Sequence, residues 1–561
     1  MDRSTKVECY SDSVEDDLAT VGQGEGKAVQ QGESMQRPTR SVAPACVALY
    51  LAVVVGLLLI ILHRDGGVFT YTLDDPYIHL ALAQSIAHGH YGINLSEASS
   101  PSSSILWPFL LTPFSDRACN QYLPLLWNIL FCGTAAWWLG RIVDGWQPRA
   151  GVAGEAVSAT SRRIAWLGRF VLAAALMLLA NLAGLTFIGM EHGLQVLLAI
   201  LCAAGVLEAF SGRRIPAWSL CAAALGPMVR YENFALVAAV AVVLYGQQRW
   251  RTALKLLGIS LIGPALFSCF LLSRGLPALP CSVMVKAHLS SAHGSTLLAK
   301  VLSLYGVCVH EHAWWGQLAL LFLLVSLMRR ERQHARRFVL GGALLAALLQ
   351  LGVGRSYWFH RYEDYAMIFT ALVAATALLS TATPRRTWRV ILLLLVLAVP
   401  YESALWQTPA AASNVYQQQY QMHRFVADFY GKTVAVNDLG WVSYHRPAGV
   451  SVLDLWGLAS PEAAQETHKN AGWLDEITTA HNAGLAIIYP EWYEEGAPDD
   501  WNLLGTMCIT SRLTSIWHPC VNIYRTAVGD PVTMRAELAA FTRTLPASVN
   551  MTLIDDSDDD K

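Results

Sequence analysis

The amino-acid sequence predicts a polytopic α-helical membrane protein that carries a soluble α/β domain in its C-terminal part. Of the 561 residues, 54% are hydrophobic and only 15% are charged, so long apolar segments have to be sheltered from water by lipid. About 11 segments have the length and the apolar character of helices that cross a bilayer. The net charge of -2, and the lack of a zinc-type spacing, a Walker loop or a dinucleotide fingerprint, argue against nucleic-acid and nucleotide binding.

The first part of the chain, residues 1–43, is polar and mixed in charge. It is too long and too acidic for the n-region of a cleaved signal peptide, so we interpret it as a disordered cytoplasmic tail before an uncleaved anchor. The predicted transmembrane domain covers residues 44–402. Its candidate spans lie at 44–63, 122–142, 166–186, 192–210, 215–229, 233–246, 256–273, 314–328, 338–354, 365–381 and 388–402.

The apolar segment SILWPFLLTPF, within residues 103–114, is too short to cross a bilayer, and we interpret it as a re-entrant or interfacial helix. With this segment left out of the count, the connections rich in Arg and Lys all fall on one side of the membrane. The positive-inside rule assigns that side to the cytoplasm. Eleven crossings therefore place the N-terminus inside and residues 403–561 outside.

Residues 403–561 are predicted to form a separate α/β domain. The runs TVAVND, SVLDLWG and LAIIYP have the composition of buried strands, and helical stretches lie between them. Cys508 and Cys520 lie in this domain and suit a local disulfide in an oxidising compartment, but two free thiols are equally compatible with the sequence.

Polar, titratable and aromatic residues gather at the outer ends of the predicted spans. They lie in an acid pair within the outer loop 64–121, in GMEHG (189–193), in VRYEN (229–233), in SVMVKAH (282–288) and in SYWFHRYEDY (356–365). Because ionisable residues at membrane depth are energetically costly, such a gathering on one face predicts a functional site.

The acid pair consists of Asp74 and Asp75. Asp75 and His79 lie four residues apart, on one face of a predicted helix whose first turn suits Pro76. In the simplest interpretation one Asp caps this helix and the other is solvated. Capping requires only one acid, however, and the second carboxylate suits a general base for an acceptor hydroxyl, or the pair suits a divalent cation.

Lys286, Arg230 and Arg361 are outward-facing cations beside apolar segments, and they suit recognition of a phosphate group. Two alternatives stay open, namely snorkelling to lipid headgroups and, for the two arginines, internal ion pairs. Further candidate substrate-binding residues are His79, Glu191, His192, Glu232, His360 and Tyr362. Glu191 and His192 are equally compatible with the start of a helix.

The order of these motifs resembles the GT-C membrane glycosyltransferases, and in particular the bacterial branch that contains the cell-wall arabinofuranosyltransferases. The resemblance covers most of residues 44–465. Its marks are the acid pair, SSPSSSILWPFLL (99–111), Gly189-Met190-Glu191, Arg230 with Glu232, the Pro280, Ser282 and Lys286 set, Arg361-Tyr362, Asp438 with Gly440, and Asp454 to Leu458. The chain departs from the family pattern at His192 and Tyr231.

The resemblance implies transfer of a sugar, such as a pentofuranose like arabinofuranose, from a polyprenyl-phosphate carrier to a hydroxyl acceptor. The acceptor class stays open between a glycan, a glycolipid and a protein. The reaction takes place at the outer face of a bacterial cytoplasmic membrane. In this scheme Asp74 or Asp75 is the base, and Lys286, Arg230 and Arg361 stabilise the departing phosphate.

We favour Asp74 as the base, because Asp75 directly precedes Pro76 and is better placed to cap the helix. No cofactor and no nucleotide sugar is required by this chemistry. A divalent metal is optional, and Asp74 and Asp75 are its candidate ligands.

Two other function classes are compatible with the sequence. A membrane transporter would also carry intramembrane charges, but transporters more often show internal repeats and helices broken at mid-membrane. A non-catalytic membrane scaffold with an exported binding domain is the third possibility, and such a scaffold should tolerate conservative changes at Asp74 and Asp75.

Overall fold

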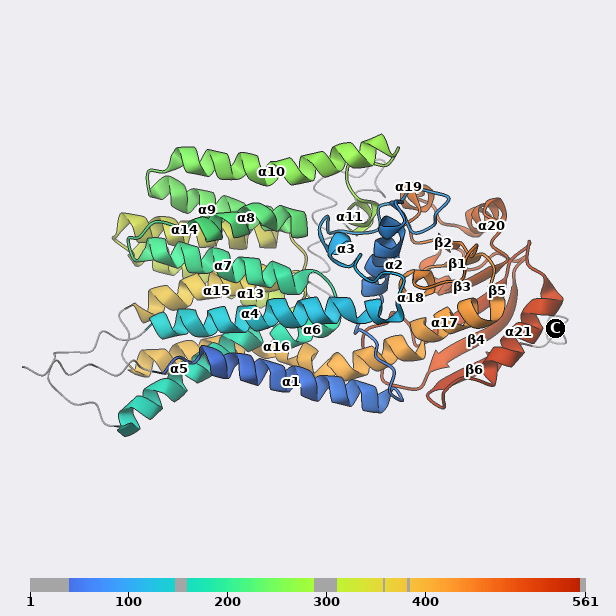
Figure 1. Ribbon diagram of the computed structural model, residues 1–561, viewed down its shortest axis with the longest axis horizontal. Coiled ribbons are helices and arrows are strands. Elements are labelled where there is room, and N and C mark those ends of the chain that lie inside the picture. Colours follow the sequence, from blue (N-terminus) through green and yellow to red (C-terminus); the bar gives the residue numbers. More distant parts are fainter. Residues whose placement is uncertain (1–39, 147–158, 287–309, 357–358, 381–383, 555–561) are drawn as a thin grey trace, which may run out of the picture. The chain divides into compact units, whose positions relative to one another are not determined.

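The computed structural model describes residues 40–146, 159–286, 310–356, 359–380 and 384–554. Within these ranges the protein is mostly helical, with one six-stranded sheet in the C-terminal region (Figure 1). The predicted cytoplasmic tail, residues 1–43, lies outside the described residues except for residues 40–43.

In the described ranges, seven helical segments are long and apolar enough to cross a membrane. They are formed by α1 (Ala43–Arg64), α4 (Leu123–Gly145), α5 (Ala159–Leu179) with α6 (Leu182–Ile188), α7 (His192–Phe210), α10 (Trp250–Ser273), α14 (His334–Val353) and α16 (Pro384–Gln417). Shorter apolar helices are α8 (Ala217–Val229), α9 (Phe234–Gly246) and α15 (Asp364–Leu379). The remaining predicted span, 314–328, lies in the 19-residue helix α13 (His312–Arg330). Each predicted span coincides with a helix, whereas the number of eleven crossings stays a prediction.

Small residues allow the apolar helices to pack closely, because lipid tails provide no hydrophobic driving force between helices and close van der Waals contact has to hold them together. The contact between α1 and α4 is an example. A Cβ atom added to Gly140 of α4 would lie 2.5 Å from the Cα of Ala43, at the start of α1. Only glycine fits at this crossing.

The segment 103–114 contains a single four-residue helix, α3 (Trp107–Leu110). A transmembrane helix needs about 20 residues, so this helix is too short to cross. It follows α2 (Asp75–Ala87), the helix that begins at the acid pair, and α2 and α3 contact each other.

The sheet has the strand order β2-β1-β3-β5-β4-β6. The predicted runs TVAVND, SVLDLWG and LAIIYP form β1 (Val434–Val436), β2 (Val452–Asp454) and β3 (Leu485–Ile488), which confirms them as strands. These three strands are parallel. The antiparallel strands β4 (Asn502–Ile509), β5 (Cys520–Arg525) and β6 (Val549–Leu553) were not predicted from the sequence.

Short helices accompany the sheet. They are α17 (Gln419–Phe425), α18 (Gly440–Ser443), α19 (Pro461–Gln465), α20 (Ala471–Ala480) and α21 (Pro531–Thr542). The predicted domain boundary between residues 402 and 403 falls inside α16, which continues to Gln417. Proline in a helix interior normally breaks or kinks the helix, yet Pro400 and Pro409 both lie within α16.

The segment 64–121 is hydrogen-bonded to the C-terminal region at several points. Asn94 donates through Nδ2 to the carbonyl oxygen of Val452 (2.9 Å) and accepts at Oδ1 from the backbone N–H of the same residue (3.0 Å). Val452 belongs to the edge strand β2, so the Asn94 amide satisfies backbone groups that an edge strand would otherwise expose. Arg446 also donates to the carbonyl oxygen of Ile93 (2.7 Å).

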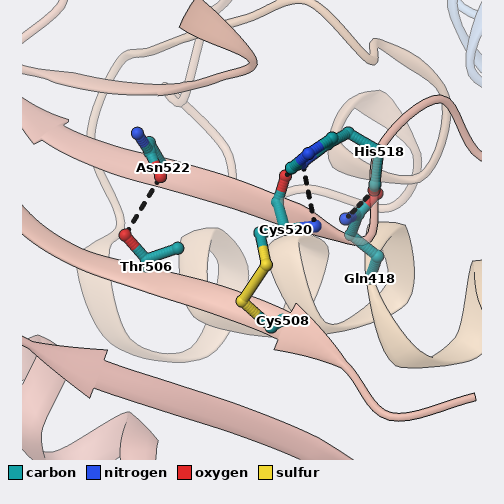
Figure 2. Close-up of a disulfide and its surroundings, with 6 residues drawn as sticks. All are labelled: Gln418, Thr506, Cys508, His518, Cys520 and Asn522. Carbon is teal, nitrogen blue, oxygen red and sulfur yellow. Dashed lines mark hydrogen bonds between the residues drawn. A yellow bond between two sulfur atoms is a disulfide. The ribbon is translucent and has the colours of Figure 1, made fainter.

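Cys508 and Cys520 form a disulfide, which decides between the two alternatives that the sequence left open (Figure 2). The two residues face each other on the antiparallel strands β4 and β5. Near this bond, Gln418 donates to the carbonyl oxygen of His518 (3.0 Å), so the connection between β4 and β5 is tied to the end of α16 (Figure 2). The disulfide therefore closes the loop between β4 and β5, and Gln418 holds the same loop through His518.

Candidate functional site

Asp74, not Asp75, occupies the N-cap position of α2, which corrects the assignment made from the sequence. Its side chain does not cap that helix. The Asp74 carboxylate instead accepts hydrogen bonds from the backbone N–H groups of Gly440 (2.6 Å) and Trp441 (2.9 Å), at the start of α18. The argument that Asp74 is the base because Asp75 caps the helix therefore fails.

The contact between α2 and α18 is close (Figure 1). A Cβ atom on Gly440 would overlap the backbone and the carboxyl group of Asp74, so glycine is required there. The ring of Trp441 stacks on the ring of Tyr77, with centroids 3.9 Å apart, and both side chains are buried. A hydrogen-bonded carboxylate and an aromatic stack thus fix the first turn of α2 against the sheet region.

Asp75 forms an ion pair with Arg361. The distance from Asp75 Oδ2 to Arg361 Nη2 is 2.7 Å, and the same nitrogen donates to the hydroxyl of Tyr362 (3.0 Å). Asp75 is 18% exposed, whereas Arg361 is 2% exposed. Burial opposes the charge on Arg361, but Tyr362 and Asp75 raise its pKa above the ordinary value, so the guanidinium stays charged.

Arg230 lies between two carboxylates. Its Nη1 is 2.7 Å from Glu191 Oε1 and its Nη2 is 2.8 Å from Glu232 Oε1. His79 Nε2 approaches the other oxygen of Glu191 at 3.8 Å. Burial disfavours a charge on Glu232, yet the neighbouring Arg230 lowers the pKa of this carboxyl below its ordinary value. The internal ion pairs that the sequence left open for both arginines are present.

Tyr362 connects these two groups of charges. The guanidinium carbons of Arg361 and Arg230 lie 4.9 Å and 5.2 Å from the centre of its ring. The ring of His192 meets the same tyrosine edge-on at 5.8 Å. Cations over an aromatic face are attracted by its quadrupole, so Tyr362 holds both guanidinium groups near one point.

Two predicted site residues have a different setting. His360 pairs with Glu363 (Nδ1 to Oε1, 3.0 Å) and borders a separate cavity of about 230 Å³ beside α16. Burial opposes a charge on His360, but Glu363 raises the pKa of its imidazole. Lys286 is the last residue of α11 (Cys281–Lys286), and its side chain lies outside the described part of the chain.

The sheet region contributes three further polar residues at the carboxyl ends of its parallel strands. Asp438 follows β1, Asp454 ends β2 and Tyr489 follows β3. Ligands of open α/β sheets bind at this edge. Asp438 Oδ2 accepts hydrogen bonds from Tyr489 Oη (3.0 Å) and from Gln419 Nε2 (2.8 Å). We did not predict Asp438 as a site residue, although an acid two residues after the buried run VAV is a sequence signal for such an edge.

The carboxyl groups of the two regions affect each other. Burial raises the pKa of Asp74 well above its ordinary value, and the charge of Asp438 raises it further. Burial also raises the pKa of Asp438, to which Asp75 and Asp454 contribute. The charge of Asp438 therefore opposes ionisation of Asp74, because like charges that are largely removed from water are costly.

A metal site on the twin acids lacks further ligands in the part of the chain that the structure describes, because no three His, Cys, Asp or Glu side chains there are arranged to hold an ion. The Asp74 oxygens accept from backbone N–H groups and Asp75 pairs with Arg361. The arrangement places carboxylates beside fixed cations.

A family model described as a domain of unknown function (DUF8728) matches residues 412–524, from the end of α16 to β5. The match includes Asp438, Asp454 and Tyr489, and thus the sheet side of the site. No curated protein and no solved structure matches the chain significantly.

Replacing Gly440 with Ala should lower the stability of the folded protein by about 1–3 kcal/mol, the usual cost of overpacking. The added methyl group collides with Asp74 and separates its carboxylate from the N–H groups of Gly440 and Trp441. The measurement is unfolding of the purified protein in detergent. Gly472→Ala is the matched control, because there the added Cβ meets only Asn470 Oδ1, at 3.6 Å. Equal stability of the two variants would contradict the close docking of α2 on α18.

Proposed function

We propose that the protein is a membrane glycosyltransferase, which moves a sugar from a polyprenyl-phosphate carrier to an acceptor hydroxyl at the outer face of the membrane. The observation that carries the proposal is the ion pair of Asp75 with Arg361, beside the Arg230 cluster. These residues come from the start of α2, the start of α7, the turn between α8 and α9, and the turn before α15. A carboxylate next to buried cations is what base-assisted attack on a phosphate-linked sugar requires.

Asp75 is the better base of the two acids. Arg361 favours its ionised form and orients it, and 18% of its side chain reaches solvent. Asp74 uses its carboxylate to hold α18, so we assign it a positioning role. This reverses the preference derived from the sequence.

In the proposed reaction Asp75 takes the proton of the acceptor hydroxyl while the acceptor oxygen bonds to the anomeric carbon of the sugar. The bond from that carbon to the phosphate oxygen breaks, and polyprenyl phosphate leaves with the bonding electrons. Arg361 and Lys286 neutralise the charge that develops on the phosphate. The reaction consumes no nucleotide.

Arg230 contributes indirectly, since its guanidinium is engaged by Glu191 and Glu232. It holds these carboxylates in place, where they and His79 can accept hydrogen bonds from sugar hydroxyls. A pentofuranose such as arabinofuranose is our proposed donor sugar, on the resemblance to the arabinofuranosyltransferase branch alone.

The outer side of a bacterial cytoplasmic membrane is the proposed location of the sheet region. The disulfide of Cys508 with Cys520 supports it, because disulfides persist in oxidising compartments and are rare in the cytoplasm. Arginines 329, 330, 332, 336 and 337, at the turn between α13 and α14, support a cytoplasmic position for the opposite ends of the helices.

Asp75→Asn should reduce sugar transfer from a synthetic polyprenyl-phosphate-sugar donor by about a hundredfold to ten-thousandfold, the contribution of a general base. The amide oxygen left by the substitution still accepts from Arg361, so the protein should remain folded. Asp74→Asn should cause a smaller loss. Asp116→Asn is the control on the same loop, because Asp116 is 69% exposed and its ion-pair partner is His88 rather than a residue of the candidate site.

Transfer rates are measured on the purified full-length protein, with thermal unfolding to verify folding of each variant. Near-normal rates for Asp75→Asn and Asp74→Asn would contradict the catalytic assignment. Loss of wild-type activity on addition of a chelator would instead make the acid pair part of a metal site.

A compartment-specific reporter fused after Lys561 should be active only in the exported compartment, and one inserted at residues 330–337 only in the cytoplasm. The physical reason is the distribution of Arg and Lys over the connections between helices. A cytoplasmic signal from the C-terminal fusion would contradict the outward orientation, and with it the proposed location of the site.

A further inference from the structure

Three tryptophans lie side by side beside the carboxyl ends of the parallel strands; two of them are exposed, and Trp492 between them is half-buried. We call the set of Trp456, Trp492 and Trp517 the tryptophan surface. The ring centroids of Trp456 and Trp492 lie 4.6 Å apart, and those of Trp492 and Trp517 lie 5.9 Å apart. Trp456 is 36% exposed and Trp517 is 53% exposed. Large aromatic residues are normally among the most buried of a fold, so a contiguous exposed group is a candidate binding surface.

The loops that carry the tryptophan surface are held rigidly. Asp454 accepts hydrogen bonds from the backbone N–H groups of Trp456 (2.9 Å), Gly457 (3.2 Å) and Ala459 (2.7 Å). Lys469 donates to the carbonyl oxygen of Trp456 (2.7 Å). Trp517 lies in the loop that the Cys508–Cys520 bond closes. Rigid aromatic loops lose little conformational freedom when a ligand binds.

The tryptophan surface lies at the same edge of the sheet as Asp438. The ring of Tyr489 lies 5.4 Å from that of Trp492, and the hydroxyl of the same tyrosine donates to Asp438 Oδ2 (3.0 Å). Asp438 in turn interacts electrostatically with Asp74 and Asp75. The buried Tyr489 thus connects Trp492 to Asp438.

We propose that the tryptophan surface binds the acceptor, and that the acceptor is an oligosaccharide. This inference rests on the proposed function and specifies its acceptor class. Sugar rings present apolar C–H faces with a slight positive charge, which complement the negative face of an indole ring. In the proposed complex the chain stacks along this surface, and its terminal hydroxyl is the group that Asp75 deprotonates.

One cation, Lys469, lies 5.4 Å from the ring centre of Trp456, and the other charges beside the tryptophan surface are carboxylates, which favour a neutral polymer over a bilayer. Glu491, Glu494 and Glu495 are exposed beside Trp492. These carboxylates repel anionic lipid headgroups and polyphosphates, but they accept hydrogen bonds from sugar hydroxyls. Trp406, by contrast, is 76% exposed on α16, one of the candidate membrane-spanning helices.

The test uses the full-length protein in lipid nanodiscs and fluorescein-labelled hexasaccharides of arabinan, galactan, mannan and glucan. Binding is measured by fluorescence anisotropy. We expect at least one hexasaccharide to bind, with a Kd that rises by about tenfold in Trp456→Ala and in Trp517→Ala, as for aromatic hot spots. Trp406→Ala is the matched control and should leave the Kd unchanged. Trp517→Ala keeps the test decisive if Trp456→Ala fails to fold.

The outcomes separate this inference from the proposed function. Binding of none of the hexasaccharides, or a Kd unaffected in the folded Trp variants, overturns the acceptor surface whatever the transferase assays give. A Trp-dependent Kd that persists in a protein without transferase activity supports the carbohydrate surface while the proposed function fails. An equal loss of affinity in Trp406→Ala also overturns the inference, because lipid-facing aromatics would then account for the signal.

Discussion

The hydrogen bonds from Gly440 and Trp441 to the Asp74 carboxylate join the segment 64–121 to the sheet region, and the arrangement of the candidate site depends on them. They fix the first turn of α2, because Asp74 immediately precedes the helix and Tyr77 in that turn stacks on Trp441. With this turn fixed, the adjacent Asp75 points to Arg361. Asp74 thus joins two parts of the chain, and the neighbouring Asp75 pairs with Arg361.

The second constraint is charge balance in a nearly dry environment. Arg230 and Arg361 are both almost completely buried, and removing one partner of a buried pair is costly because it leaves the other charge uncompensated. Glu191, Glu232 and Asp75 supply the opposing carboxylates. Tyr362, between the two guanidinium groups, gives them a common aromatic face. A set of charges held this firmly is preorganised, as the proposed stabilisation of a phosphate charge requires.

The sequence predicted the helical segments well, because apolar runs leave few other possibilities for a chain in lipid. It also identified β1, β2 and β3, whose residues are buried throughout. It missed β4, whose residues are partly half-buried and therefore give a weak apolar signal. The end of the long helix was placed too early, because Pro400 and Pro409 are tolerated inside α16.

The predicted topology placed Asp75, Arg361, Arg230 and Glu191 at one face of the helices. In the structure Asp75 pairs with Arg361, and Arg230 pairs with Glu191. The role of Asp74 was beyond the sequence. Its partner Gly440 lies 366 positions away along the chain, and no local pattern encodes a contact of that range. Asp438 was similarly overlooked as a site residue, because its importance follows from the edge of a sheet whose strand order cannot be derived from short runs.

The account depends most on Asp75 and Arg361 acting as one unit in sugar transfer. A double-mutant cycle with Asp75→Asn, Arg361→Gln and the combined variant, measured as kcat/KM for a polyprenyl-phosphate-sugar donor, tests this directly. Residues that act as a unit show strongly non-additive effects. We therefore expect the double variant to be no slower than the slower single variant. Losses that multiply independently, or a normal rate in all three variants, would contradict the account.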